Sequence, residues 1–173
     1  MPTETIFIFD LSRVIIVKMQ PISKITSRLY LTNAKSVAKV SSLTKRKIKY
    51  VLTVMNEPLP LEVVLTLLDS NILVENIPFA EDSDVSLKEL QLILESIANK
   101  INTHTQHHPM VIHCVKGQNR SPAAVLYWLI FHKGMSFENA LEYLGNRRHI
   151  LIDPCWIRKI KKMARIARHA DLQ

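Results

Sequence analysis

The chain contains little cysteine. Only two of its 173 residues, Cys114 and Cys155, are cysteines, so it can form at most one disulfide. A protein of this size with so few cysteines is typical of a reducing, intracellular compartment, and we expect the cytoplasm or the nucleus. The seven histidines show no paired ligand spacing, which argues against a zinc site. The sequence HTQHH at 104–108 instead has the composition of a solvated loop.

Long apolar runs are also missing. No window has the roughly 18 uncharged apolar residues that a membrane-spanning helix needs. The apolar segment 3–19 carries Glu4, Asp10 and Arg13 and has no basic leader, which argues against a cleaved signal peptide. We interpret residues 1–21 as a strand-rich N-terminal extension that serves packing or homodimerisation.

Linkers, repeats and low-complexity segments are absent from the sequence. A chain of 173 residues without a Pro-, Gly- or Ser-rich linker is expected to fold as one domain with a continuous core. We assign that domain to residues 22–173, after the N-terminal extension.

Basic residues are in excess, and the net charge of +8 predicts an anionic partner. They gather in KRKIK (45–49) and in RKIKKMARIARH (158–169). Such runs form either solvated faces or a field that attracts phosphorylated protein, lipid head groups or RNA. No aromatic residues are interleaved in these runs, which weakens the case for RNA.

Apolar periodicity predicts strands that alternate with helices, followed by a block of helices. This order favours an α/β fold with a central, mostly parallel twisted sheet flanked by helices. Ser121 and Pro122 predict an N-cap and first helical residue, and Ser136 opens the next helix after Gly134. The expected strands are 28–32, 49–55, 71–77 and 110–114; the expected helices are 60–69, 86–101, 121–133, 136–148 and 154–169.

The sequence CVKGQNR at 114–120 therefore joins a strand to a helix. Amide groups at such a helix start, together with the helix dipole, form a site for a phosphate-sized anion. Gly117 permits the sharp turn, and Arg120 offers a planar fork of donors for two phosphate oxygens. The same positive field would lower the pKa of Cys114 and favour its thiolate. With Ser121 as a hydrogen-bond donor to the sulfur, the segment predicts a nucleophile that attacks phosphorus.

The sequence HCVKGQNRS (113–121) resembles the H-C-x-x-G-x-x-R-S signature of the cysteine-dependent protein phosphatases, and specifically of their small dual-specificity group, which includes viral members. The resemblance covers roughly residues 22–165. It implies hydrolysis of phosphotyrosine and phosphoserine or phosphothreonine in protein substrates through a phosphocysteine, with no metal or cofactor. Further segments similar to the family are ISKITSRLYLTNAKSVAK (22–39), YVLTVMNE (50–57), NIPF (76–79) and GMSFENALEYLGNRRHILIDPCW (134–156).

The resemblance also assigns roles to matching positions. Cys114 is the nucleophile, Arg120 binds phosphate and stabilises the transition state, and Ser121 assists breakdown of the thiophosphate. His113 orients the loop and tunes the thiolate. The phosphate would be bound by the backbone from Val115 to Arg120, through Lys116, Gly117, Gln118 and Asn119.

Three residues are candidates for the general acid, because the family places an Asp before the signature and IPFAEDSDVSL (77–87) offers three acids. Counting back from Cys114 favours Asp82, and counting forward from the start of this segment favours Glu81. We expect Asp82 to be the acid, with Glu81 and Asp84 as alternatives; geometry decides between them.

One departure from the family and the basic surface leave alternatives open. Cys155 stands where relatives often have an Asn that braces the phosphate loop, and a disulfide with Cys114 could protect the nucleophile from over-oxidation. Lys116 and the basic surface would suit an RNA 5′-phosphatase or a phosphoinositide phosphatase, although Ser121-Pro122 differs from the Thr-Gly of RNA-acting relatives. A non-catalytic phosphate-binding pseudophosphatase is the third alternative.

Overall fold

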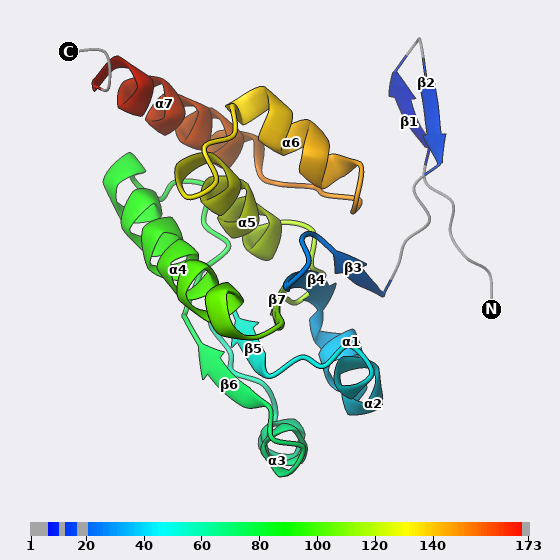
Figure 1. Cartoon of the computed structure of the whole chain (residues 1–173). Helices are drawn as coiled ribbons and strands as arrows, with labels where there is room; N and C mark the ends of the chain where they lie inside the picture. The colour runs from blue at the N-terminus through cyan, green and yellow to red at the C-terminus, as the bar shows by residue number, and fades with distance from the viewer. Residues whose placement is uncertain (1–6, 11–12, 17–20, 171–173) are drawn as a thin grey trace.

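The computed structural model describes residues 7–10, 13–16 and 21–170. Its centre is a five-stranded sheet with the strand order β3-β4-β7-β5-β6 (Figure 1). A separate two-stranded sheet pairs β1 (Phe7–Asp10) with β2 (Arg13–Ile16), so the N-terminal extension contains strands as expected. The other residues before position 21 lie outside the described residues, and homodimerisation stays a prediction. The central strands are β3 (Ile22–Lys24), β4 (Leu29–Asn33), β5 (Tyr50–Thr53), β6 (Leu73–Asn76) and β7 (Met110–Cys114).

The sheet is mostly parallel, as the sequence predicts. β4, β7, β5 and β6 run parallel, and only β3 on the edge is antiparallel to its neighbour β4. The register places Asn33 of β4 and Cys114 of β7 side by side, and Thr53 of β5 beside His113. The carboxyl ends of three adjacent strands therefore meet at one edge of the sheet, where ligands bind in α/β folds.

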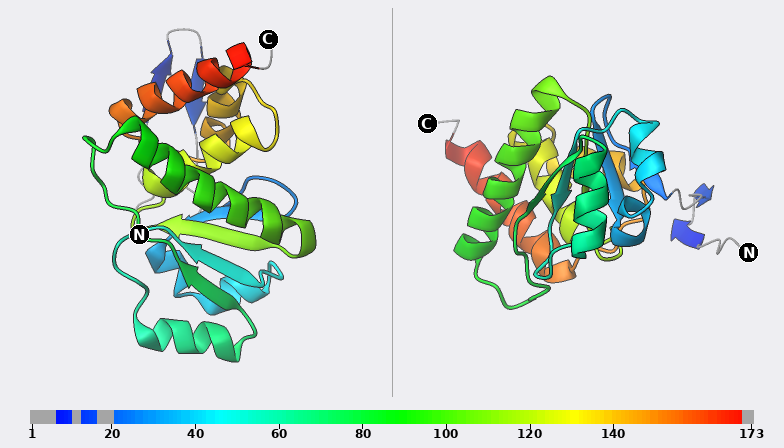
Figure 2. Two further views of the ribbon diagram at one scale, coloured as in Figure 1. Left: turned by 90° about the vertical axis from the view of Figure 1, so that its left-hand side faces the viewer. Right: turned by 90° about the horizontal axis from the view of Figure 1, so that it is seen from below.

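Helices cover both faces of this sheet (Figures 1 and 2). Ile112 and Cys114 of β7 belong to the core beneath the larger helical layer, whereas Val111 belongs to the core beneath the smaller layer. All five residues of β7 are buried, as expected of a central parallel strand. The smaller layer contains α1 (Ala34–Val37), α2 (Val40–Thr44) and α3 (Leu61–Asp69), and the larger contains α4 (Leu87–His107), α5 (Arg120–Phe131), α6 (Phe137–Gly145) and α7 (Pro154–Ala170).

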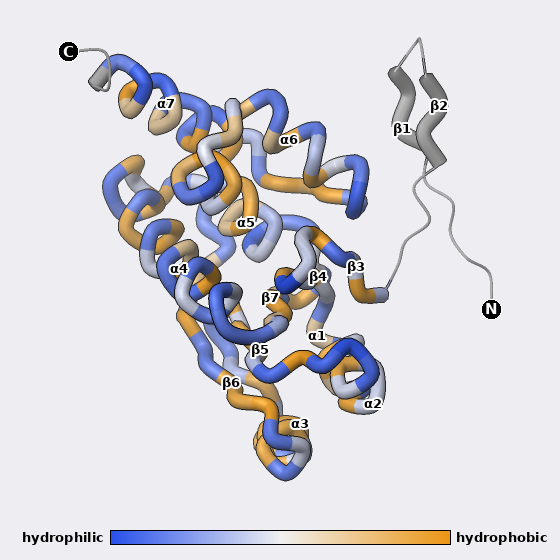
Figure 3. The backbone as a smooth tube through the Cα atoms, viewed as in Figure 1, coloured by the Kyte–Doolittle hydropathy of each residue, from blue (hydrophilic) through white to orange (hydrophobic). Residues whose placement is uncertain are grey.

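Apolar and polar residues alternate along α4 and α7, which each present one apolar side to the core (Figure 3). α5 differs from these two helices, because its residues from 120 to 130 are all buried. A helix that is buried all round is enclosed by its neighbours. Among the described residues, no helix combines the length and apolar character needed to cross a bilayer.

The start of α4 agrees with the sequence, but its end does not. Ser86, at which the predicted helix 86–101 begins, caps α4 in a reciprocal capping box with Glu89. The loop predicted at 104–108 is wrong, because α4 continues to His107. The ring of His104 stacks on Tyr50 at a centroid distance of 3.5 Å, so this polar-looking turn packs on the sheet. The helix ends just before Pro109, which disfavours helical backbone at the preceding residue.

The start of α5 also differs from the prediction by two residues. The N-cap is Asn119 rather than Ser121, and the helix begins at Arg120. Pro122 is therefore the third helical residue, where its missing N–H still has no intrahelical partner to lose. This shift places Arg120 and Ser121 in the first turn of the helix, directly after the loop that follows Cys114.

Candidate active site

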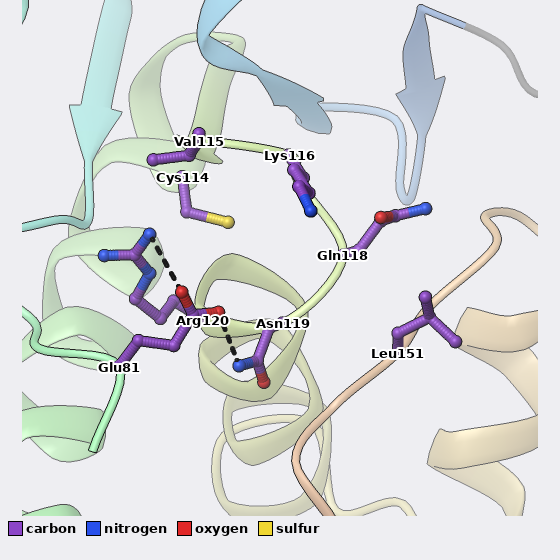
Figure 4. Close-up of a pocket in the computed structure, with 8 residues that line it drawn as sticks. All are labelled: Glu81, Cys114, Val115, Lys116, Gln118, Asn119, Arg120 and Leu151. Carbon is purple, nitrogen blue, oxygen red and sulfur yellow. Dashed lines mark hydrogen bonds and ion pairs between the residues drawn. The ribbon is translucent and has the colours of Figure 1, made fainter.

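A cavity of about 250 Å3 opens at the carboxyl end of β7 (Figure 4). The sequence analysis named most of the residues in its wall, but it did not single out Leu151. Figure 4 shows Leu151 on the opposite side of the cavity from Glu81. The lining residues are Glu81, Cys114, Val115, Lys116, Gln118, Asn119, Arg120 and Leu151.

Cys114 is 2% exposed, and its sulfur accepts a hydrogen bond from Ser121 Oγ at 3.2 Å. Burial by itself raises the pKa of the Cys114 thiol. Hydrogen bonds from the Ser121 hydroxyl and from the amides of Ser121, Gly117 and Asn119 outweigh burial and bring this pKa below its usual value. Those donors stabilise a thiolate, which is the nucleophilic form of cysteine.

The lowered pKa gives a prediction for alkylation. Because the thiolate reacts, the rate of Cys114 labelling by iodoacetamide should rise with pH and level off below the value of about 8.5 typical of a free thiol. Ser121→Ala removes a donor and should move this midpoint to higher pH. Peptide mapping by mass spectrometry separates Cys114 from Cys155. A wild-type midpoint equal to that of free cysteine would contradict the assigned environment.

Arg120 is 7% exposed and joins the loop to the segment before α4. Its Nη1 donates to the carbonyl of Phe79 at 3.1 Å, and its Nη2 lies 3.7 Å from Glu81 Oε2. Its Nε is buried and has no hydrogen-bond partner within the part of the chain that the structure describes. An unpaired buried donor is costly, and a bound oxyanion would satisfy it.

His113 is fully buried beside Cys114. Its Nε2 lies 2.8 Å from Thr53 Oγ1, and its Nδ1 lies 3.3 Å from the carbonyl oxygen of Cys114. Since a carbonyl only accepts, Nδ1 carries the proton and the Thr53 hydroxyl donates to Nε2. Burial lowers the pKa of His113 to about 4, so the ring is neutral at pH 7. His113 thus holds the backbone of Cys114 and brings no positive charge to the thiolate.

Arg148 is a second buried arginine at the site, and sequence reasoning missed it. Its Nε donates to the carbonyl of Gly117 at 2.6 Å, and its Nη1 donates to Ser23 Oγ at 3.1 Å. Gly117 has a φ of +66°, and a Cβ there would lie 2.1 Å from the carbonyl oxygen of Thr32. The loop is therefore packed directly on β4 and tied down by Arg148. In the sequence, only the adjacent pair Arg147-Arg148 could have drawn attention to this position.

Cys155 does not form the disulfide considered from the sequence, because both cysteines are free thiols. Its sulfur accepts a hydrogen bond from Arg158 Nη2 at 2.8 Å. Cys155 replaces the Asn that often braces the phosphate loop in relatives, and other residues hold the loop here. Arg148 donates to the carbonyl of Gly117, and Asn119 Oδ1 accepts from the backbone N–H of Asp153 at 2.9 Å.

The three candidate acids have different positions. Glu81 lines the cavity, and its Oε1 accepts from Asn119 Nδ2 at 2.8 Å. The carboxylate of Asp82 instead accepts a hydrogen bond from the backbone N–H of Asp84 at 2.8 Å. Asp82 and Asp84 are not among the residues that line the cavity in the described structure. Of the three candidates, only Glu81 is therefore among the cavity-lining residues of the described structure, and the identity of the general acid stays a prediction.

The chain is similar to known proteins in sequence and in fold. Residues 29–165 match the family model described as "Dual specificity phosphatase, catalytic domain". The chain is 29% identical over 108 residues to dual specificity protein phosphatase H1 of Variola virus, which covers 62% of this chain and 58% of that protein. It is also 36% identical over 75 residues to the phosphatidylinositol 3,4,5-trisphosphate 3-phosphatase and protein-tyrosine-phosphatase PTEN1 of Arabidopsis thaliana, covering 43% of this chain and 18% of that one.

These curated relatives are matched over less than two thirds of their own length. The crystal structure of human DUSP28 superposes with a TM-score of 0.67 at 16% sequence identity, over 86% of this chain and 96% of that one, which shows a shared fold. The family model spans the four parallel strands of the central sheet, the loop after Cys114 and most of the larger helical layer. The chain belongs to the family of dual specificity phosphatase catalytic domains.

Proposed function

We propose that this protein hydrolyses phosphotyrosine and phosphoserine or phosphothreonine in protein substrates through a phosphocysteine intermediate, with residues 22–173 as its catalytic domain. The observation that carries the proposal is the pairing of Cys114 and Arg120. The buried Cys114 thiol, whose pKa is lowered, lines a cavity that Arg120 also lines. Within the described residues, Nε of Arg120 has no hydrogen-bond partner. A nucleophile and a phosphate-binding fork are what transfer of a phosphoryl group requires.

In the first step, the Cys114 thiolate attacks phosphorus as the bond to the leaving oxygen breaks. Arg120 and the loop amides stabilise the charge on the equatorial phosphate oxygens. The leaving oxygen needs a proton, and we assign its delivery to Glu81, whose carboxyl group lines the same cavity. The products are a phosphocysteine and the free hydroxyl group of the substrate.

In the second step, water attacks the phosphocysteine and the P–S bond breaks. The Glu81 carboxylate takes a proton from this water, so the acid is regenerated. Cys114 leaves as a thiolate, which accepts the hydrogen bond from Ser121 Oγ that is 3.2 Å away in the structure. Inorganic phosphate then leaves the cavity.

The assignment of the acid predicts a contrast between two matched variants. Glu81→Gln should lower kcat for a phosphothreonine peptide by about 10²-fold or more, because an alkoxide leaves poorly without a proton. It should affect an aryl phosphate much less, because that leaving group needs little acid help. Asp82→Asn keeps the acceptor for Asp84 and should change both rates little. A larger leaving-group effect in Asp82→Asn than in Glu81→Gln would return the role to Asp82.

The proposed function is tested by substrate comparison and by trapping. Rates should be measured for phosphotyrosine and phosphothreonine peptides, a 5′-triphosphate RNA and a phosphoinositide. Rapid acid quenching followed by mass spectrometry should find the phosphoryl group on the peptide that contains Cys114. Turnover of the RNA or the lipid alone would overturn the protein-phosphatase assignment, and an absence of turnover with retained phosphate binding would indicate a pseudophosphatase.

A further inference from the structure

Asn119 connects two segments that are far apart in the sequence. Its Nδ2 donates to Glu81 Oε1 at 2.8 Å, and its Oδ1 accepts from the backbone N–H of Asp153 at 2.9 Å (Figure 4 shows the contact with Glu81). A backbone N–H can only donate, so it fixes the oxygen of the Asn119 amide on the Asp153 side. The amide nitrogen must then face Glu81, and the carboxyl oxygen that it meets must accept.

Asp153, the other end of this connection, is itself fixed. Its carboxylate accepts from Ser83 Oγ at 2.6 Å and from the backbone N–H of Cys155 at 2.7 Å. The hydrogen bond from Ser83 is the largest cause of the lowered pKa of Asp153. Because Ser83 is two residues after Glu81, the segment 81–84, here called the acid segment, is held at two points by Asp153, the residue before α7.

A second set of contacts reinforces the same attachment. Trp156 Nε1 donates to the carbonyl of Asp82 at 2.9 Å, and Lys159 Nζ donates to the carbonyl of Ser83 at 3.0 Å. The Trp156 ring also stacks on Phe79 at a centroid distance of 4.8 Å. The backbone of the acid segment is thus anchored, and the side chain of Glu81 is left to be oriented by its own contacts.

The hydrogen bond from Asn119 orients that side chain. Oε1 accepts a hydrogen bond of 2.8 Å from the amide, whereas Oε2 lies 3.7 Å from Arg120 Nη2, too far for a hydrogen bond. A proton on the Glu81 carboxyl group is therefore favoured on Oε2. Oε2 is therefore directed to the part of the cavity where Arg120 would hold a phosphate. We propose that Asn119 is a positioning residue that aligns the acidic proton of Glu81 with the leaving oxygen, an inference that rests on the proposed function.

Asn119→Asp tests this inference, because aspartate retains an acceptor for the Asp153 N–H and loses the donor to Glu81. The expected result is a fall of about 10-fold or more in kcat for a phosphothreonine peptide, with a much smaller fall for an aryl phosphate. If Asn119 had only a structural role, Asn119→Asp would lower the rates for both substrates by the same factor, and that result would overturn the proposal.

Two further variants separate the possible failures. Asn139→Asp makes the same change at an exposed residue in the first turn of α6 and controls for charge. In a Glu81→Gln background, Asn119→Asp should not further change the ratio of the rates for the phosphothreonine peptide and the aryl phosphate, since the two residues act together. If Glu81→Gln shows no leaving-group effect, the acid assignment itself fails. If Glu81→Gln shows the effect and Asn119→Asp does not, only the positioning role of Asn119 is overturned.

Discussion

Replacing Cys114 by serine is expected to lower the turnover of every phosphomonoester by at least about 10⁴-fold. A serine hydroxyl has no comparable tendency to ionise, so the hydrogen bonds that favour a thiolate would have no anion to stabilise. Phosphopeptide binding should persist or tighten, because the variant removes the negative charge that faces the phosphate while Arg120 and the loop amides remain. Steady-state kinetics and calorimetric titration with a phosphotyrosine peptide measure the two effects.

Cys155→Ser is the matched control for this experiment. Cys155 is half-buried, is a free thiol and is not among the residues that line the cavity in the described structure. Its replacement should leave turnover close to wild type. Wild-type turnover in Cys114→Ser, or loss of turnover in Cys155→Ser alone, would refute the assignment of the nucleophile.

Replacing Arg120 by lysine is expected to lower kcat/KM by about 10³-fold or more, although the charge is conserved. A lysine ammonium group has no planar fork, so it cannot hold two phosphate oxygens at once. It also cannot reproduce both the hydrogen bond to the Phe79 carbonyl and the approach to Glu81. Kinetics with an aryl phosphate isolate the loss at the phosphate, because that substrate needs little help from the acid.

The control is Arg165→Lys, which makes the same exchange at an exposed position of α7 and should be nearly neutral. Thermal unfolding of both variants shows whether the buried site tolerates the exchange. If Arg120→Lys folded like the wild type and retained its kcat/KM, the guanidinium would have no special role in binding phosphate.

The central sheet and most helices were predictable because their signals are local. The apolar run that ends in Cys114 and the periodicity of the helices on either side follow from side-chain spacing alone. The first residues of α4 and α6 were also readable, since Ser86 and Ser136 cap their own helices. The end of α4 was missed because the packing of His104 on Tyr50 joins residues far apart in the chain.

The loop after Cys114 was predictable from the sequence alone, because residues 113–121 are contiguous. A strand that leads into a helix through a short turn brings Cys114, Gly117 and Arg120 close together. The rest of the cavity wall depends on how distant segments pack. Glu81, Arg148 and Leu151 come from other segments, and their distance along the sequence from Cys114 does not fix their positions in space. Their positions depend on how the acid segment docks on α7 and how Arg148 is buried against the loop, which are contacts that exist only in the folded chain.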